Sequence, residues 1–196
     1  IEPRPAPKIV LMEVPDDIII EQDVVYAVMD GHGLKLDIAY SKVDRGNLPA
    51  IINIHGGGWL MGDKNPNEAI IETEHGFVGI SIQYRKSNVA KFPAAVHDCK
   101  TAVRWARANA EKYRIDPHRI AVIGGSAGGH LAAILGVSNG NGYLEGDGPY
   151  QEFSSDVQTA VDQFGPTDFA RMNDVPGNMD HNLPSGPESQ FLGKPV

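Results

Sequence analysis

The chain has 196 residues, which suits one domain and is short for two. It carries 25 acidic against 17 basic residues, and the net charge of −8 argues against nucleic acid or an anionic membrane as its partner. Charged residues make up 21% and hydrophobic residues 41%, as in a globular domain and unlike a disordered segment. The single cysteine, Cys99, excludes an intrachain disulfide and a multi-cysteine zinc site.

Two stretches bear on targeting and membranes. Residues 1–8 carry prolines and charges where a signal peptide would be apolar, so we expect no leader there. Residues 120–137 form an 18-residue stretch without Asp, Glu, Lys or Arg, which is long enough for a membrane span. Four glycines and Ser126 interrupt it, so we expect a strand followed by a helix and no membrane span.

Strand patterns dominate the first part of the chain. Residues 18–29 and 34–43 are rich in β-forming residues and are joined by the turn-like residues 30–33, which predicts an antiparallel hairpin. Residues 50–55 and 77–84 are almost continuously apolar. Such runs are typical of strands that are buried on both faces of a parallel sheet.

Residues 93–113 have the clearest helical pattern. Pro93 stands at the first turn, where proline is tolerated, and apolar residues recur every three or four positions. Three basic residues fall outside this stripe and are expected to face water: Arg104, Arg107 and Lys112. The pair Asp116-Pro117 then predicts a turn.

A strand at 119–123 and a helix at 127–137 follow, and one more strand is predicted at 157–164. Residues 139–156 form a polar, glycine-rich connection whose acid spacing does not fit a calcium-binding EF-hand loop. No periodicity is visible from 165 to 196. The alternation predicts an α/β fold over residues 1–196, a single domain with a mostly parallel sheet and helices on both faces.

The segment Gly124–Gly128 reads GGSAG and lies between the predicted strand and helix. A nucleophilic serine on such a turn needs small neighbours, because a Cβ would clash there. The turn exposes the Ser126 hydroxyl and aims the first amides of the helix at a bound group. The pentapeptide is common by itself, but its placement at a strand–helix turn favours a nucleophile.

The segment His55–Trp59 reads HGGGW and directly follows a predicted buried strand. Glycines leave backbone amides free to donate to the negative oxygen of a tetrahedral intermediate. A phosphate-binding loop would need Lys-Ser or Lys-Thr after the glycines, and Trp59-Leu60 stands there instead. The two motifs together, about 70 residues apart, are specific.

With these motifs the chain resembles the α/β-hydrolase esterases, and most closely the bacterial feruloyl or acetyl-xylan esterase-like group (BD-FAE), which is related to the hormone-sensitive-lipase esterases. The segments KLDIAY (35–40), FGPTDF (164–169) and PESQFLG (187–193) add to the likeness, which covers about residues 30–196. Gly125 and His130 stand where the lipase-like branch has Asp and Asn, which favours the carbohydrate-esterase branch.

The resemblance implies that Ser126 is the nucleophile and that the amides of Gly57, Gly58 and Ala127 form the oxyanion hole. Trp59 is a candidate for the substrate pocket, and neither a cofactor nor a metal is expected. The resemblance also favours a secreted or periplasmic bacterial protein that acts on a small ester or an esterified polysaccharide.

Ser126 needs a base, and this fold orders the triad as Ser, acid, His. Only His130 and His181 follow Ser126; His130 is expected to pack under the turn, and no visible element holds His181. Asp168 is the best acid within the chain, whereas Asp162 lies inside a strand. His97 and Asp98 are helix neighbours and do not face each other.

By the resemblance, two C-terminal strands with the usual acid and histidine are expected beyond Val196. The leading hypothesis is a serine carboxylic ester hydrolase for short-acyl or carbohydrate-linked esters. The alternatives are a catalytically incompetent fragment or ligand-binding protein that lacks the base, and an amidase or peptidase of the same fold.

Overall fold

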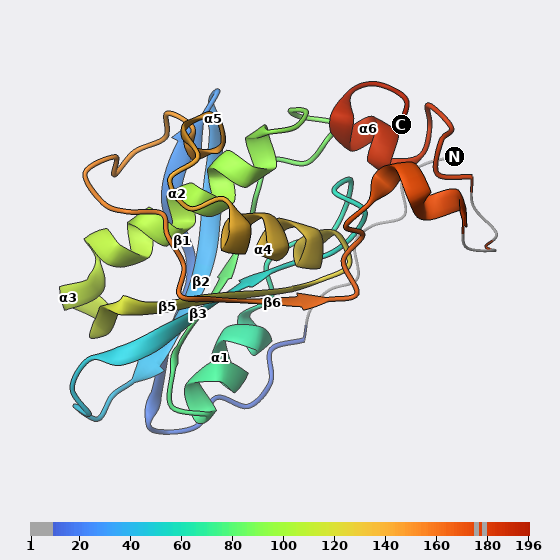
Figure 1. Ribbon diagram of the computed structural model, residues 1–196. Helices are drawn as coiled ribbons and strands as arrows, with labels where there is room; N and C mark the ends of the chain where they lie inside the picture. The colour runs from blue at the N-terminus through green and yellow to red at the C-terminus, as the bar shows by residue number, and fades with distance from the viewer. Residues whose placement is uncertain (1–9, 175–176, 178–179) are drawn as a thin grey trace.

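The computed structural model describes residues 10–174, 177 and 180–196, so the expectation for residues 1–8 lies outside it. Its six strands form one mixed sheet in the order β1-β2-β4-β3-β5-β6 (Figure 1). Strands β1 (Ile18–Met29) and β2 (His32–Ser41) pair antiparallel and confirm the predicted hairpin. β2 also pairs antiparallel with β4 and so joins the hairpin to the rest of the sheet.

The other four strands run parallel to one another and form the centre and one edge of the sheet. Their bounds are β3 (Leu48–Ile54), β4 (Val78–Ile82), β5 (Ile115–Gly125) and β6 (Thr159–Gln163). Every residue of β4 is buried, as its continuous apolar run predicts. The carboxyl ends of β3 and β5 lie side by side, since Ile54 is in register with Gly124. This edge carries both glycine motifs.

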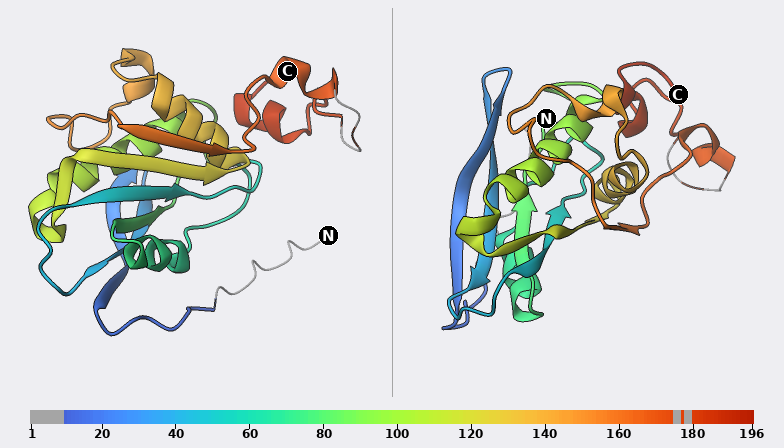
Figure 2. Two further views of the ribbon diagram at one scale, coloured as in Figure 1. Left: turned by 60° about the horizontal axis from the view of Figure 1, so that its bottom comes forward. Right: turned by 60° about the vertical axis from the view of Figure 1, so that its left-hand side comes forward.

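Helices cover both faces of the sheet, which confirms the predicted α/β arrangement (Figure 2). One face is packed by α1 (Pro66–Glu74), and the other by α2 (Ala94–Ala108) and α4 (Ala127–Val137). The helix α1 is absent from the sequence prediction. Asn65 caps its first turn by accepting from the amide of Asn67, and Pro66 is at its first position.

The predicted helix 93–113 and the turn that follows it need three corrections. The helix is interrupted at Asn109, after which α3 (Ala110–Tyr113) forms a short turn of its own. Arg104 does not face water: it is 2% exposed. Its guanidinium binds the carboxylate of Glu145, which also accepts from buried Lys100, so a distant partner makes the burial possible. Asp116-Pro117 lies within the longer strand β5 and does not separate two elements.

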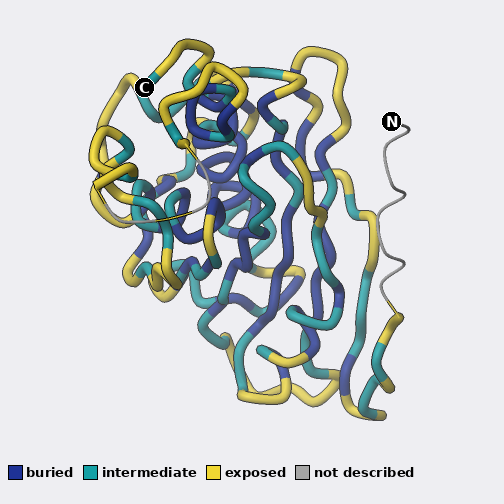
Figure 3. The backbone as a smooth tube through the Cα atoms, turned by 90° about the vertical axis from the view of Figure 1, so that its right-hand side faces the viewer, coloured by how far each residue is buried: buried dark blue, intermediate teal, exposed yellow. Residues whose placement is uncertain are grey.

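The C-terminal third of the chain is mostly loops with short helices. The connection 139–156 contains α5 (Gly142–Glu145), and the region after β6 contains a 3₁₀ helix (Phe169–Asp174) and α6 (Pro187–Leu192). The tube in Figure 3 is buried along the central strands, whereas much of this last segment is exposed. Among the described residues no helix is long and apolar enough to cross a membrane.

Candidate active site

Ser126 occupies the sharp turn between β5 and α4 that its glycine neighbours predict. Its backbone has φ 55° and ψ −122°, a strained combination for a residue with a side chain, and the residue is exposed. The amide of Ser126 donates to the carbonyl of Gln163 at 2.9 Å, which anchors the turn to the end of β6. The fold therefore stores local strain at this serine and presents it to solvent.

Gly128 allows α4 to pack closely on the end of β3. A Cβ at Gly128 would overlap with the carbonyl oxygen of Ile54. Ala127 is the first residue of α4, so its amide has no acceptor inside the helix. The same turn thus presents the Ser126 hydroxyl together with an unused amide at a helix N-terminus, where negative charge is favoured.

The glycine loop after β3 lies directly against this turn. A Cβ at Gly56 would be 3.5 Å from the Cβ of Ser126. Gly57 has φ 111° and its carbonyl accepts from the amides of Leu60 and Met61, both at 3.1 Å, so the loop closes into a turn. Within the described residues neither Gly57 nor Gly58 donates its amide to a backbone carbonyl or a side chain. Both amides are therefore available to a ligand.

Trp59 is nearly fully buried, at 2% exposed. Its ring stacks on Phe191 of α6 at 4.7 Å between centroids and meets Phe169 and His130 edge to face. Its carbonyl accepts from the amide of Ser87 at 2.8 Å. The ring thus holds the glycine loop to the C-terminal segment. Phe169 and Phe191 were not proposed as site residues, although both lie in segments that carried the family resemblance.

His55 supports the same loop. Its Nδ1 lies 2.7 Å from the carbonyl oxygen of Gly56, and its ring stacks on Tyr84 at 4.3 Å. Burial lowers the pKa of the His55 imidazole, so the ring is held neutral. This contact with the backbone makes His55 a support of the glycine loop.

The two histidines that follow Ser126 are placed differently. The His130 ring stacks on Phe169 at 4.9 Å, and burial lowers its pKa to about 4. Nδ1 of His181 lies 3.1 Å from a carboxylate oxygen of Glu188, which is 3% exposed. Within the described part of the chain, no histidine is hydrogen-bonded to the Ser126 hydroxyl.

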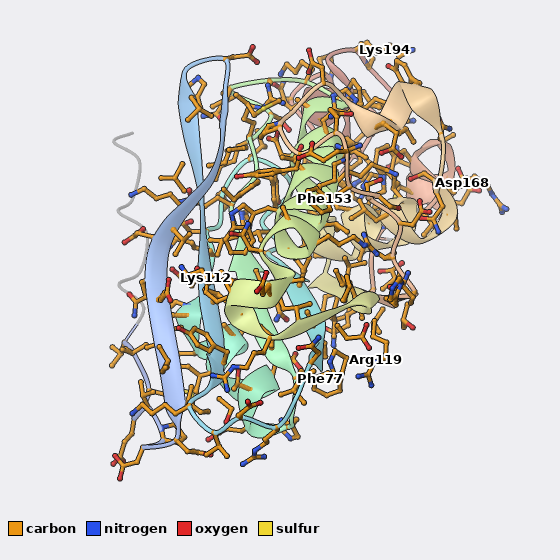
Figure 4. The ribbon with its side chains drawn as sticks, turned by 90° about the vertical axis from the view of Figure 1, so that its left-hand side faces the viewer. Phe77, Lys112, Arg119, Phe153, Asp168 and Lys194 are labelled. Carbon is orange, nitrogen blue, oxygen red and sulfur yellow. The ribbon has the colours of Figure 1, made fainter. Side chains whose placement is uncertain are left out.

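The candidate acids also have separate surroundings. Asp168 is exposed and lies in the C-terminal segment, near the margin of the view in Figure 4. Its carbonyl accepts from the amide of Arg171 at 3.2 Å, and no contact of its carboxylate is found among the described residues. Asp162 accepts from the amide of Gly165 at 2.7 Å and so shapes the turn after β6, as a structural residue would. His97 contacts the carbonyl of Tyr143, whereas Asp98 binds Arg85, so these neighbours form no dyad.

No group of three or more potential ligands for a metal ion is found in the described ranges. The described residues at the site offer a strained, exposed hydroxyl beside amides that donate to no described acceptor. Such a set can attack a carbonyl carbon and hold the oxygen that becomes negative.

The chain is similar to known esterases in sequence and fold. A profile of the BD-FAE family matches residues 36–196. The probable carboxylic ester hydrolase LipM of Mycobacterium tuberculosis is 33% identical over 133 residues, which are 66% of this chain and 30% of that protein. The chain thus spans less than a third of the length of this curated relative.

Solved structures extend the likeness to the fold. A truncated carbohydrate esterase from gut microbiota superposes with a TM-score of 0.76 at 35% identity, covering 93% of this chain and 69% of that one. Esterase 2 of Thermogutta terrifontis, phosphonylated by sarin, gives 0.67 at 27% identity, covering 93% and 64%. Both are similar over nearly all of this chain.

Proposed function

The chain belongs to the BD-FAE family, and from this premise we propose that it carries the nucleophile and the oxyanion hole of a serine carboxylic ester hydrolase. The observation that carries the proposal is the exposed Ser126 in its strained turn, with Gly56 of the glycine loop in contact with it. A serine held only for packing would have no need of this backbone conformation or of free amides beside it.

In the proposed reaction the Ser126 oxygen attacks the carbonyl carbon of the ester and loses its proton to a base. The carbonyl oxygen becomes negative and accepts hydrogen bonds from the amides of Ala127, Gly57 and Gly58. The intermediate collapses, the alcohol leaves with a proton, and an acyl-serine forms. Water then attacks the acyl-serine, releasing the acid and restoring the hydroxyl.

The base is the part of this mechanism that the described residues do not provide. His130 is half-buried among aromatic rings, and its lowered pKa makes it a poor proton acceptor near neutral pH. His181 lies beside Glu188 and makes no hydrogen bond to the Ser126 hydroxyl within the described residues. The proposal therefore requires a histidine from outside the described residues, and Asp168 is the candidate acid within them.

The substrates that we propose are short-acyl or carbohydrate-linked esters. The similarity to a carbohydrate esterase supports the second class, and the similarity to a carboxylic ester hydrolase supports the first. Trp59 is buried against Phe191, so its contribution to a pocket would be through the position of the glycine loop.

Hydrolysis by matched variants tests the proposal, and every variant includes the segment that supplies the catalytic histidine, since the described residues do not. Wild type, Ser126→Ala and the control Ser185→Ala, which changes an exposed serine, are assayed on p-nitrophenyl acetate, p-nitroacetanilide and acetylated xylan. We expect ester cleavage that Ser126→Ala lowers by at least about 10³-fold and Ser185→Ala leaves unchanged. Ester cleavage that survives in Ser126→Ala would overturn the assignment, and cleavage of the anilide alone would favour an amidase.

A further inference from the structure

The segment that returns from the glycine loop to α1, residues 60–65, is folded back onto the start of that loop. Gly62 has φ 93°, and a Cβ there would lie 2.5 Å from Nδ1 of His55 and overlap with the carbonyl oxygen of Gly56. The returning half of the loop, residues 60–65, is thus in direct contact with its first half, residues 55–59. Any shift of the returning half would displace the half that borders Ser126.

Three polar contacts fasten the returning half to neighbouring strands. The Lys64 ammonium donates to a carboxylate oxygen of Asp37 in β2 at 2.6 Å. The amide of Asn65 donates to the Ser81 hydroxyl of β4 at 2.9 Å. The side chain of Gln83, just after β4, donates to the Asp63 carboxylate at 2.8 Å. The contacts come from three successive residues of the loop and reach β2 and β4, which are adjacent strands on one side of β3.

The Lys64–Asp37 pair is largely buried. The Asp37 side chain is 0% exposed and that of Lys64 is 11% exposed. The carboxylate oxygen of Asp37 that binds Lys64 also accepts from the amide of Asp23 at 3.0 Å, and the other oxygen has no partner within the described residues. Asp37 without Lys64 would therefore be a buried and uncompensated charge.

Lys64 keeps its charge in this position. Burial alone would lower the pKa of its ammonium, but the bonds to Asp37 and Asp23 outweigh burial and raise it. Asp23 lies 3.2 Å away and is largely exposed, so it adds a second, weaker contact. The pair thus links strand β2 to the loop through an ionic contact.

We propose that Lys64 and Asp37 are positioning residues that hold the glycine loop in its oxyanion-binding arrangement beside Ser126. Neither residue reaches the reacting atoms; both act through the amides of Gly57 and Gly58. The inference rests on the proposed function, since the amides matter catalytically only if Ser126 forms a tetrahedral intermediate.

This role predicts a particular kinetic effect. Oxyanion donors stabilise the transition state more than the bound substrate, so a loosened loop lowers kcat with little change in KM. A residue that only stabilises the fold would change the amount of folded enzyme and its melting temperature, but not kcat per folded molecule.

The test compares Lys64→Met with Lys64→Arg and with the control Lys35→Met, all in the protein that includes the segment supplying the catalytic histidine. Lys35 also approaches Asp23, at 3.5 Å, but is 43% exposed and lies outside the loop. We expect Lys64→Met to lower kcat on p-nitrophenyl acetate by about tenfold or more, with KM within about twofold. Lys64→Arg should recover most of kcat, and Lys35→Met should match wild type. If Lys64→Met does not fold, Lys64→Gln replaces it with the same expectation.

Hydrogen exchange at the amides of residues 56–59 gives a readout that needs no activity. At a temperature where all variants are folded, exchange there should be faster in Lys64→Met than in Lys35→Met. Equal kcat and equal exchange in these two variants would overturn the inference.

Wild type and Ser126→Ala are assayed in parallel to separate the two proposals. Ser126-dependent hydrolysis with an unaffected Lys64→Met variant would refute only the positioning role. A wild type without Ser126-dependent hydrolysis would refute the proposed function, and the exchange rates would then decide by themselves whether Lys64 holds the loop.

Discussion

Gly128 is the residue at which the turn around Ser126 tolerates least change, because any side chain there would meet the carbonyl oxygen of Ile54. We predict that Gly128→Ala lowers the free energy of unfolding by about 2–4 kcal/mol, since the backbones of α4 and β3 must separate. Gly142→Ala is the matched control, because a Cβ at Gly142 meets nothing within 4 Å. Urea unfolding of both variants measures the difference, and equal stabilities would contradict this account of the turn.

The protonation of His130 makes the free energy of unfolding depend on pH. Burial lowers the pKa of its imidazole from 6.5 to about 4, so the unfolded chain binds this proton more readily than the folded protein. The stability that neutral His130 contributes is complete above about pH 6.5 and is lost as the pH falls toward 4, by up to about 3 kcal/mol.

Replacement of His130 by phenylalanine should flatten this part of the pH profile, because the new ring still packs on Phe169 but cannot take up a proton. The measurement is the urea midpoint between pH 4 and 7 for His130→Phe, wild type and the exposed-histidine control His118→Gln. A wild-type slope that persists in His130→Phe would mean that other groups carry it.

The helix α2 is held by more than its apolar stripe. Lys100 and Arg104, 0% and 2% exposed in their side chains, both bind the carboxylate of Glu145, which α5 brings over from the connection 139–156. Burial would raise the pKa of the Glu145 carboxyl, but its bonds to Lys100, Ser155 and Arg104 lower it overall. The contact therefore stabilises the fold above the ordinary pKa of glutamate and weakens as acid protonates it.

We predict that Glu145→Gln lowers the free energy of unfolding by about 2–3 kcal/mol at pH 7, because two buried cations lose their counter-charge. Glu152→Gln, a change at an exposed position of the same connection, is the control and should lie within about 0.5 kcal/mol of wild type. Chemical unfolding measures both, and an unchanged Glu145→Gln variant would contradict the buried network.

The sheet was the most predictable part of this protein. Continuous apolar runs predict strands that are buried on both faces of a sheet, and the turn residues 30–33 predict the hairpin. The helix α1 was not predicted because only a few of its residues are buried, among them Ala69 and Ile70, so its apolar pattern is weak. The pair Asn65-Pro66 was a signal for the start of a helix that could have been used. Arg104 was predicted to face water because helical periodicity cannot reveal a partner 41 residues away.

The candidate site was predictable where it depended on local sequence. The motifs around Ser126 and Gly57 describe turns whose geometry follows from glycine itself. Lys64 in the loop and Asp37 in β2 are 27 positions apart in the sequence, so no local sequence pattern could predict their contact. The aromatic packing of Trp59 on Phe191 is likewise a product of tertiary structure.

Covalent labelling is the most direct test of whether Ser126 is an activated nucleophile. The protein, including the segment that supplies the catalytic histidine, is treated with a fluorophosphonate, and the modified peptide is located by mass spectrometry in wild type, Ser126→Ala and Ser185→Ala. An activated nucleophile at the turn predicts one adduct on Ser126, absent from Ser126→Ala and retained in Ser185→Ala. Labelling of another residue that persists in Ser126→Ala, or ester hydrolysis by a protein that takes up no label, would contradict it.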